Sequence, residues 1–206
     1  MKCLIIAANL ESEIRELIQP DDYSFIICAD SSFVHAIEEN IRIDLIIGDF
    51  DHESFCEAQL PKDVEVIRLP SVKDDTDTQY CIKEALSRGY NDIDIVGGTG
   101  GRLDHTIANI QSLAYACKRN ATAKLIDKNN EIIVIDKDIS IKKGKKYFSV
   151  FSLTDYSIVN IKGAFYSGEN IKLTNTFPLG VSNEFTCEKT DIEVLSGTIV
   201  LAISED

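Results

Sequence analysis

The stretch DLIIGDFD, residues 44–51, shows how the first part of this chain is organised. Three apolar residues and a glycine, typical of a buried strand, run directly into Asp49 and Asp51. In an extended chain, side chains two residues apart point to the same side, and two neighbouring carboxylates repel each other unless a cation lies between them. The stretch therefore predicts either a strand that ends at a cation site or a strand followed by a structural acidic turn, because Asp also favours turns.

Similar apolar runs recur up to about residue 125 and alternate with helical patterns. This alternation at short spacing predicts βαβ units and a mostly parallel sheet. Gly89 is expected to end the helix that precedes it. The expected strands are 3–8, 23–29, 44–48, 64–69, 92–97 and 123–126, and the expected helices are 10–18, 31–39, 53–60, 77–89 and 102–119.

The last of these helical patterns has apolar residues that recur at intervals of three and four. Such spacing predicts one helix face that points toward the core. The residues of this expected core stripe are Leu103, Ile107, Ile110, Ala114 and Cys117.

The texture of the sequence changes after residues 127–130. Short β-branched runs follow, separated by Gly, Asn, Asp and Lys, without a convincing helix among them. This pattern predicts an all-β domain. We therefore expect a Rossmann-like α/β domain with a mostly parallel sheet over residues 1–125, followed by a small all-β sandwich domain over residues 126–206.

Composition excludes some classes of partner. Of the 206 residues, 44% are hydrophobic and 27% are charged, as in ordinary globular proteins. The 34 acidic residues outnumber the 21 basic ones, for a formal net charge of -13. Because nucleic-acid binding depends largely on clustered Lys and Arg, we expect no nucleic-acid partner. An anionic ligand would need a metal ion as intermediary.

The cysteines and the apolar runs indicate the compartment. There is no Cys-x-x-Cys pair and no Cys/His cluster with zinc spacing, so we expect reduced core thiols. No apolar stretch is long enough to cross a membrane, and Met1 leads directly into a strand-like run rather than a signal peptide. We therefore expect a cytoplasmic protein with no membrane partner. The cysteines are Cys3, Cys28, Cys56, Cys81, Cys117 and Cys187.

Polar residues follow four successive expected strands. In an open parallel sheet, ligands bind outside the carboxyl ends of the strands, so these residues are expected to meet at one edge. Oxygen ligands without Cys or His suit a hard cation, and Mg²⁺ is expected where a site also holds phosphates. The residues that follow the strands are Asp30; Asp49 and Asp51; Asp74, Asp75 and Asp77; and the loop 97–102.

The three aspartates at 74–77 open an expected helix. Asp is a preferred N-cap and is favoured by the helix dipole, so we expect Asp74 or Asp75 to cap this helix. Three acids in four residues exceed what a cap requires. We therefore expect Asp77 to be a metal ligand.

The stretch GGTGGRLDH, residues 97–105, joins a glycine loop to the start of the last expected helix. Backbone N–H groups and the positive end of the helix dipole can hold phosphate at such a place, and Arg102 adds a fork of donors. Asn109 shares a helix face with His105. The alternative is a glycine-rich connection that serves only a tight turn.

Taken together, in this order and spacing, three stretches resemble the thiamin pyrophosphokinase family: DLIIGDFD, then KDDTDT at 73–78, then GGTGGRLDHTIANI at 97–110. PLGVSNEF, residues 178–185, resembles the Ser-Asn segment that contacts thiamine in this family. The resemblance covers essentially the whole chain. It implies a catalytic domain that binds ATP and Mg²⁺ over residues 1–125 and a thiamine-binding domain over residues 126–206.

The resemblance also implies the activity and the roles of single residues. The activity is transfer of a diphosphoryl group from ATP to thiamine, giving thiamin diphosphate and AMP, by a Mg²⁺-dependent homodimer whose sites combine domains of both subunits. The implied residues are Asp49, Asp51 and Asp77 for Mg²⁺; Asp74, Asp77, Arg102 and Asp104 for catalysis; Asp30, Gly97, Gly98, Thr99, Gly100, Gly101, Arg102 and Asn109 for the nucleotide; and Lys73, Ser182 and Asn183 for thiamine.

This sequence departs from the family pattern in two places. It contains no tryptophan, so a ring that stacks on thiamine would have to be a Phe or Tyr, such as Phe185 or Tyr166. ADSS, residues 29–32, stands where relatives commonly carry glycines after the aspartate. Three other interpretations are open: a diphosphokinase acting on another alcohol such as a hydroxymethylpterin, a metal-dependent phosphohydrolase, and a non-catalytic nucleotide or vitamin sensor.

Overall fold

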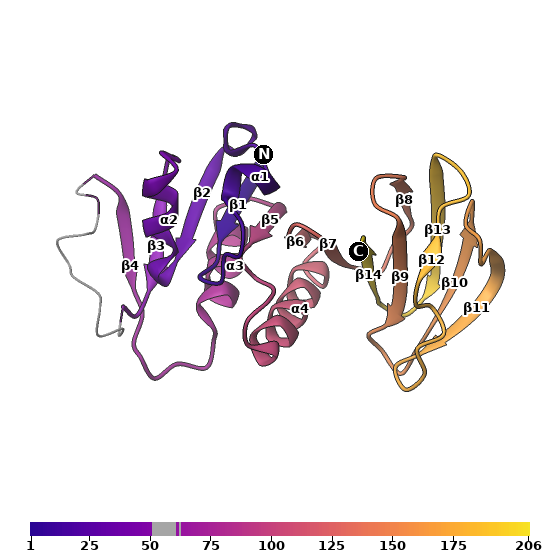
Figure 1. The fold of residues 1–206 in the computed structure, drawn as a ribbon. Helices are drawn as coiled ribbons and strands as arrows, with labels where there is room; N and C mark the ends of the chain where they lie inside the picture. Colours follow the sequence, from indigo (N-terminus) through magenta and orange to yellow (C-terminus); the bar gives the residue numbers. More distant parts are fainter. Residues whose placement is uncertain (51–60, 62) are drawn as a thin grey trace. The chain divides into compact units, whose positions relative to one another are not determined.

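The structure is a computed structural model that describes residues 1–50, 61 and 63–206. It forms two compact units, Met1–Lys128 and Asn129–Asp206 (Figure 1). The first unit is α/β and the second is all β, so the chain has a mixed α/β fold. Asp51 and the helix expected at 53–60 lie outside the described residues.

The first unit contains the expected parallel sheet. Every strand pair in it is parallel, and the spatial order is β6-β5-β1-β2-β3-β4. Connections therefore leave β1 toward one edge and β5 toward the other. The strands are β1 (Lys2–Ile6), β2 (Phe25–Ala29), β3 (Leu45–Gly48), β4 (Glu65–Arg68), β5 (Asp92–Val96) and β6 (Thr122–Ile126).

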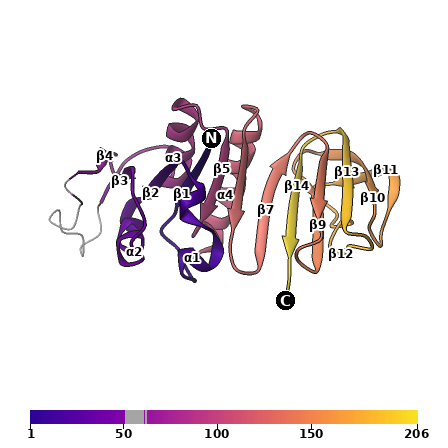
Figure 2. The same cartoon turned by 90° about the horizontal axis from the view of Figure 1, so that it is seen from above.

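Both faces of the central strands are buried, which explains why they read as continuous apolar runs. Leu4 and Ile6 pack in one core cluster with Ile14 and Phe33 of the first two helices. The third helix packs on strands β1, β2 and β3, and the fourth helix packs on β6. Figure 2 shows α1 and α2 on one side of these strands and α3 on the other. The helices are α1 (Ile14–Leu17), α2 (Phe33–Glu38), α3 (Asp77–Ser87) and α4 (Leu103–Cys117), with short 3-10 helices η1 (Pro20–Asp22) and η2 (Asp30–Ser32).

Helix α1 is much shorter than the helix expected at 10–18. The chain continues in extended form after β1, because the backbone N–H groups of Ala7 and Asn9 donate to the carbonyls of Val96 and Gly97 at 2.8 and 3.1 Å. These hydrogen bonds to the neighbouring strand end hold the chain away from helical geometry as far as Asn9. The helix begins only at Ile14, where the backbone N–H groups of Ile14 and Arg15 donate to the Glu39 carboxylate at 2.7 and 3.0 Å.

The two ends of α3 correct one expectation and confirm another. The N-cap is Thr76 rather than Asp74 or Asp75: its backbone is extended and its hydroxyl accepts the N–H of Gln79 at 3.1 Å. At the other end, Gly89 has φ +87°, and its N–H donates to the carbonyl of Leu86, as expected for a C-terminal glycine.

The core stripe expected for α4 is wrong: of its five residues only Cys117 is buried, and Ile110 and Ala114 are half-buried. Leu103 and Ile107 are 71% and 52% exposed. The buried stripe begins only at Asn109 and continues along the helix, which packs on β6 and α3. Its members are Asn109, Ser112, Leu113, Ala116 and Cys117, so the buried face is turned around the helix from the expected one, and the two share only Cys117.

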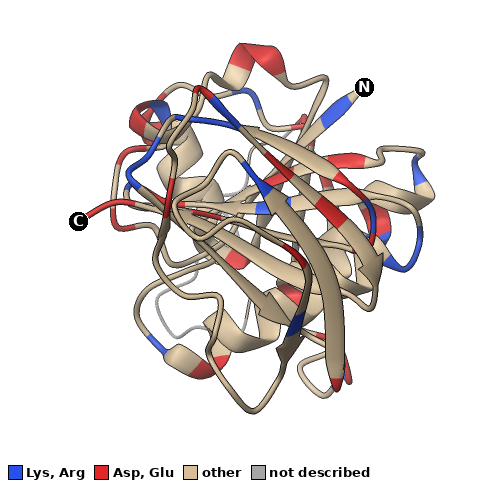
Figure 3. Ribbon diagram, turned by 90° about the vertical axis from the view of Figure 1, so that its right-hand side faces the viewer, with Lys and Arg blue, Asp and Glu red and all other residues tan. Residues whose placement is uncertain are grey.

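The second unit consists of antiparallel strands and, over residues 129–206, contains no helix. Its core cluster draws side chains from both sets of paired strands, including Phe148, Ile161 and Ile192. Acidic and basic residues are both spread over its strands (Figure 3). One set is β7 (Asn130–Ile135), β14 (Ile199–Ser204), β9 (Tyr147–Ser152) and β12 (Asn183–Glu184), and the other is β11 (Gly168–Thr174), β10 (Tyr156–Lys162), β13 (Lys189–Ser196) and β8 (Ile139–Lys142).

None of the helices in the described part of the chain combines the length and the apolar character that a membrane crossing requires.

Candidate functional site

An open cavity of about 550 Å³ lies in the first unit, where the chain leaves β1, β2, β3 and β5. Strands β1 and β5 are neighbours whose connections run in opposite directions, and ligands of open α/β sheets bind at such a switch point. The residues of the sequence prediction that line the cavity are Asp30, Asp49, Lys73, Asp77, Gly97, Gly98, Thr99, Gly100, Arg102 and Asn109.

Two carboxylates meet at one ammonium group in this cavity. The Nζ atom of Lys73 lies 2.6 Å from Asp49 Oδ2 and 2.8 Å from Asp77 Oδ1. The side chains of Lys73, Asp49 and Asp77 are 15%, 13% and 27% exposed. Burial would lower the pKa of Lys73, but the hydrogen bonds to Asp49 and Asp77 outweigh it and the pKa is raised. Lys73 therefore carries its positive charge at neutral pH.

This arrangement fits a divalent cation. Asp49 at the end of β3 and Asp77 at the start of α3 are close enough to contact one cationic atom, and both offer only oxygen ligands. Among the described residues, no group of three or more His, Cys, Asp or Glu side chains is placed to hold a metal ion. The expected third ligand, Asp51, lies outside the described residues.

Asp30 is held tightly at the end of β2. It is 8% exposed and has φ +52°, a left-handed conformation that is uncommon outside glycine. A side chain at the neighbouring Gly48 would bring its Cβ within 2.8 Å of the Asp30 Cα atom. Gly48 thus lets the backbone at Asp30 pack against β3. The glycine that gives Asp30 this room lies on the neighbouring strand, not in the residues that follow Asp30 in the sequence.

The glycine loop that follows β5 is fixed from several sides. Gly97 has φ +71°, and a Cβ there would meet the carbonyl oxygen of Ala7 at 2.5 Å. The buried Asn109 amide donates to the carbonyl of Gly98 at 2.7 Å, and Asn9 donates to the carbonyl of Thr99. The Thr99 hydroxyl donates to Asp127 at 2.7 Å. The loop is therefore held in one shape before any ligand arrives.

Arg102 and Asp104 form an exposed pair at the start of α4. Two guanidinium nitrogens donate to the Asp104 carboxylate, at 2.6 and 3.2 Å. The hydrogen bond to Arg102 holds the pKa of Asp104 below its usual range. Arg102 lines the cavity, whereas Asp104, Asp74 and Gly101 do not. An incoming anion would have to compete with Asp104 for Arg102.

Ser182 and Asn183 belong to the second unit. Ser182 is exposed and has φ +55°, again a left-handed conformation. Asn183 is 5% exposed, and its amide bonds both the N–H and the carbonyl of Tyr166, at 2.9 and 3.0 Å. Phe185 packs in the core against Phe148, with ring centroids 5.0 Å apart. Of the two expected stacking rings, Tyr166 is the exposed one, at 63%.

Sequence reasoning missed Asn9, which lines the cavity and fixes the glycine loop. The rule that places ligands at the carboxyl ends of strands applies equally to the first strand, and Asn9 lies three residues after β1 ends. That rule, applied to the stretch after Ile6, would have found it. Thr76 also lines the cavity, beside its role as the cap of α3.

A parallel sheet whose loops bring carboxylates, a rigid glycine turn and a helix N-terminus to one cavity is typical of the class of α/β proteins that bind phosphate-bearing ligands. Comparison with known proteins identifies the family. Residues 19–126 match the model of the thiamin pyrophosphokinase catalytic domain. This chain therefore belongs to the thiamin pyrophosphokinase family.

Similar proteins extend the match to the whole chain. The thiamine pyrophosphokinase of Bacillus subtilis strain 168 is 29% identical over 209 residues, covering 98% of each chain. The crystal structure of the Bacillus subtilis protein superposes with a TM-score of 0.85 at 26% identity over 100% of both chains. A thiamin pyrophosphokinase family protein from Enterococcus faecalis gives a TM-score of 0.86 at 27% identity, again over 100% of both chains.

Proposed function

We propose that this enzyme is a thiamine diphosphokinase, which transfers the diphosphoryl group of ATP to the hydroxyethyl oxygen of thiamine and releases thiamin diphosphate and AMP. Family membership and the names of the full-length relatives support the substrates. The observation that carries the proposal is the convergence of Asp49, Asp77 and the Gly97–Gly101 loop on one cavity. Phosphoryl transfer needs mainly positioned groups and charge stabilisation, which such a cavity supplies.

Asp49, Asp51 and Asp77 would hold Mg²⁺, which supplies positive charge beside the phosphate oxygens when bound. The shared contact of Asp49 and Asp77 with one ammonium supports this assignment for two of the three. Asp74 or Asp104 would accept the proton of the thiamine hydroxyl. Asp104 begins with a lowered pKa, so it would need Arg102 to turn toward the substrate before it could act as a base.

Backbone N–H groups of the Gly97–Gly101 loop, together with Arg102, would hold the nucleotide phosphates at the N-terminus of α4. The fixed loop favours this role because its donors need no reordering when the ligand binds. Asn109 would act through the loop, since its amide is already bound to Gly98. Asp30 would lie beside the nucleotide at the neighbouring strand end.

Ser182, Asn183 and Lys73 would contact or position thiamine. Ser182 is exposed for direct contact, whereas Asn183 would act by fixing Tyr166, the ring that we assign to stacking. The sites would be shared in a homodimer, each with residues 1–125 of one subunit and residues 126–206 of the other. We also propose that the first domain is Rossmann-like and that the second is a sandwich, which its shared core cluster supports. Among the described residues, the cysteines Cys3, Cys28, Cys81, Cys117 and Cys187 form no disulfide, which favours a cytoplasmic location.

Phosphorus NMR of the purified protein with Mg-ATP and thiamine tests the proposal. Paired appearance of AMP and thiamin diphosphate is expected. Formation of ADP or orthophosphate would indicate a phosphohydrolase or an ordinary kinase, and absence of any change would favour a sensor. Turnover of a hydroxymethylpterin but not of thiamine would show that the enzyme is a diphosphokinase that acts on another alcohol.

Asp77→Asn tests the metal assignment. We expect a loss of about a hundredfold or more in turnover, because the variant removes a charged ligand at the reacting phosphates. Asp92→Asn, at the other end of β5, is the matched control and should keep its activity. Circular dichroism should show both variants folded. Turnover like that of the wild type in Asp77→Asn at ordinary Mg²⁺ concentration would refute the assignment.

A further inference from the structure

Lys73 occupies the position between the two carboxylates to which we assign the metal. Its Nζ atom touches Asp49 and Asp77 at once, at 2.6 and 2.8 Å. All three side chains are largely shielded from solvent, so salt screens their interaction less than it would at the surface. If no cation lay between them, two carboxylates close enough to contact the same atom would repel each other.

An ammonium and a divalent ion cannot occupy this position together. Both need the same carboxylate oxygens, and two cations in contact repel. The Lys side chain is a flexible four-carbon stem, and Lys73 lines a cavity of about 550 Å³. Its ammonium can therefore swing into the cavity without any change in the fold, toward the place where phosphates would lie.

We infer that Lys73 is a built-in competitor for the metal, one that couples metal binding to nucleotide binding. In the metal-free protein its ammonium closes the Asp49–Asp77 pair. A divalent cation enters by displacing it, and the displaced ammonium then pairs with the phosphates of the nucleotide. The inference rests on the proposed function for the identity of the metal ligands, but it assigns Lys73 to the metal ligands and the nucleotide phosphates instead of to thiamine. By linkage, each ligand then strengthens binding of the other.

Two titrations with opposite expected signs test this inference. Binding of Mn²⁺ alone, followed by electron paramagnetic resonance, should be about tenfold tighter in Lys73→Met than in the wild type, because the competitor is gone. Binding of ADP at saturating Mn²⁺, followed by calorimetry, should be weaker in the same variant, because the displaced ammonium is missing. A merely structural role for Lys73 would weaken both.

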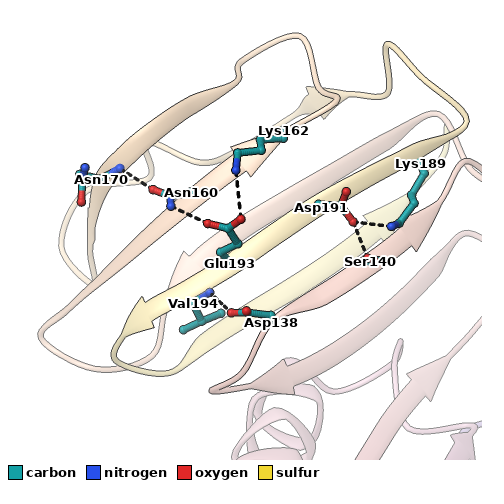
Figure 4. Close-up of polar contacts among 9 residues, drawn as sticks. All are labelled: Asp138, Ser140, Asn160, Lys162, Asn170, Lys189, Asp191, Glu193 and Val194. Carbon is teal, nitrogen blue, oxygen red and sulfur yellow. Dashed lines mark hydrogen bonds and ion pairs between the residues drawn. The ribbon is translucent and has the colours of Figure 1, made fainter.

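Lys162→Met is the matched control. Lys162 also pairs with a carboxylate, with its Nζ atom 3.1 Å from Glu193, but on the exposed face of the second unit (Figure 4). The substitution removes the same charge from the protein while leaving the cavity intact. Both of its affinities should stay within twofold of the wild type. Lys73→Arg keeps the positive charge that competes with the metal, so this variant should bind Mn²⁺ no more tightly than the wild type does.

The outcomes separate this inference from the proposed function. The Mn²⁺ titration contains neither ATP nor thiamine, so a protein without thiamine activity can still support the inference. Equal or weaker Mn²⁺ binding by Lys73→Met, or unchanged ADP binding, would overturn it even in an active enzyme. If Lys73→Met does not fold, Lys73→Gln replaces it. Mg²⁺ should then raise the Tm of the variant more than that of the wild type.

Discussion

At the scale of single residues, the buried carboxylate of Asp94 is paired through one oxygen, Oδ2, while its Oδ1 atom is buried without a hydrogen-bond partner. Asp94, in the middle of β5, is 2% exposed, and its Oδ2 atom accepts from the Tyr23 hydroxyl at 2.6 Å and contacts Lys2 Nζ at 2.7 Å. Burial, followed by the hydrogen bond to Asp94, raises the pKa of Tyr23. Tyr23 therefore remains a protonated donor across the range in which the protein works. Removing it would leave a buried charge with one partner fewer.

Tyr23→Phe should lower the free energy of unfolding by about 1 to 3 kcal/mol, the cost of leaving a buried acceptor partly unsatisfied. Urea denaturation followed by circular dichroism measures the loss. Tyr156→Phe removes the same hydroxyl from a ring that is 50% exposed, and should change stability by less than about 0.5 kcal/mol. Equal effects of the two substitutions would show that Asp94 does not depend on Tyr23.

At the scale of elements, the connection from β5 to α4 has the strictest backbone requirements of the site. Gly97 has a left-handed φ of +71°, and a Cβ atom added at this position would lie 2.5 Å from the Ala7 carbonyl oxygen. Because the obstacle is backbone, it cannot turn aside as a side chain could. The loop after β1 and the loop after β5 are therefore coupled, and disturbing one moves the other.

Gly97→Ala should cost about 2 kcal/mol or more in the free energy of unfolding, from left-handed strain together with the clash. It should also abolish most of the turnover, because the phosphate-binding donors would move. Gly144→Ala is the control, since Gly144 has no heavy atom within 4 Å of a built Cβ and no positive φ. Thermal unfolding and the phosphorus NMR assay measure the two effects. A stable, fully active Gly97→Ala variant would contradict the role given to this loop.

At the scale of the whole molecule, the second unit has exposed apolar side chains in two stretches, 165–166 and 177–181. Exposed hydrophobic groups in such number are typical of an interaction surface. The second stretch immediately precedes Ser182 and Asn183, which the proposed function places at thiamine, and Asn183 bonds to Tyr166 of the first stretch. A subunit that covers them would also close the site, which supports the proposed homodimer. These residues are Phe165, Tyr166, Phe177, Leu179 and Val181.

Mixing two inactive variants tests whether the subunits share their sites. Asp77→Asn alters only residues 1–125 and Asn183→Ala only residues 126–206, so a mixed dimer would contain one intact site. Random exchange of equal amounts should restore about a quarter of the wild-type activity if each site draws on both subunits of a symmetric dimer. The control is a mixture of two separate preparations of the Asp77→Asn variant, which should stay inactive. No recovery after verified subunit exchange would show that each site belongs to one chain.

Much of this arrangement was accessible from the sequence. The apolar runs that end in Asp30, Asp49 and the 97–101 loop predict parallel strands, and parallel strands bring their carboxyl ends to one edge whatever the details of packing. Gly89 predicts the end of a helix, because few other residues readily adopt the left-handed backbone conformation that helix ends use. Local patterns and fold-level rules agree at these positions, so the prediction needs no knowledge of long-range contacts.

What only the tertiary structure decided is how side chains far apart in the sequence meet. The contacts of Lys73 with Asp49, of Asn183 with Tyr166 and of Gly48 with Asp30 join different elements, and sequence spacing does not predict them. The same holds for Leu103 and Ile107, whose helical spacing predicts a core-facing stripe but whose side chains are 71% and 52% exposed. Periodicity shows where apolar residues recur along an element, whereas the position of its neighbours determines which face of that element is buried.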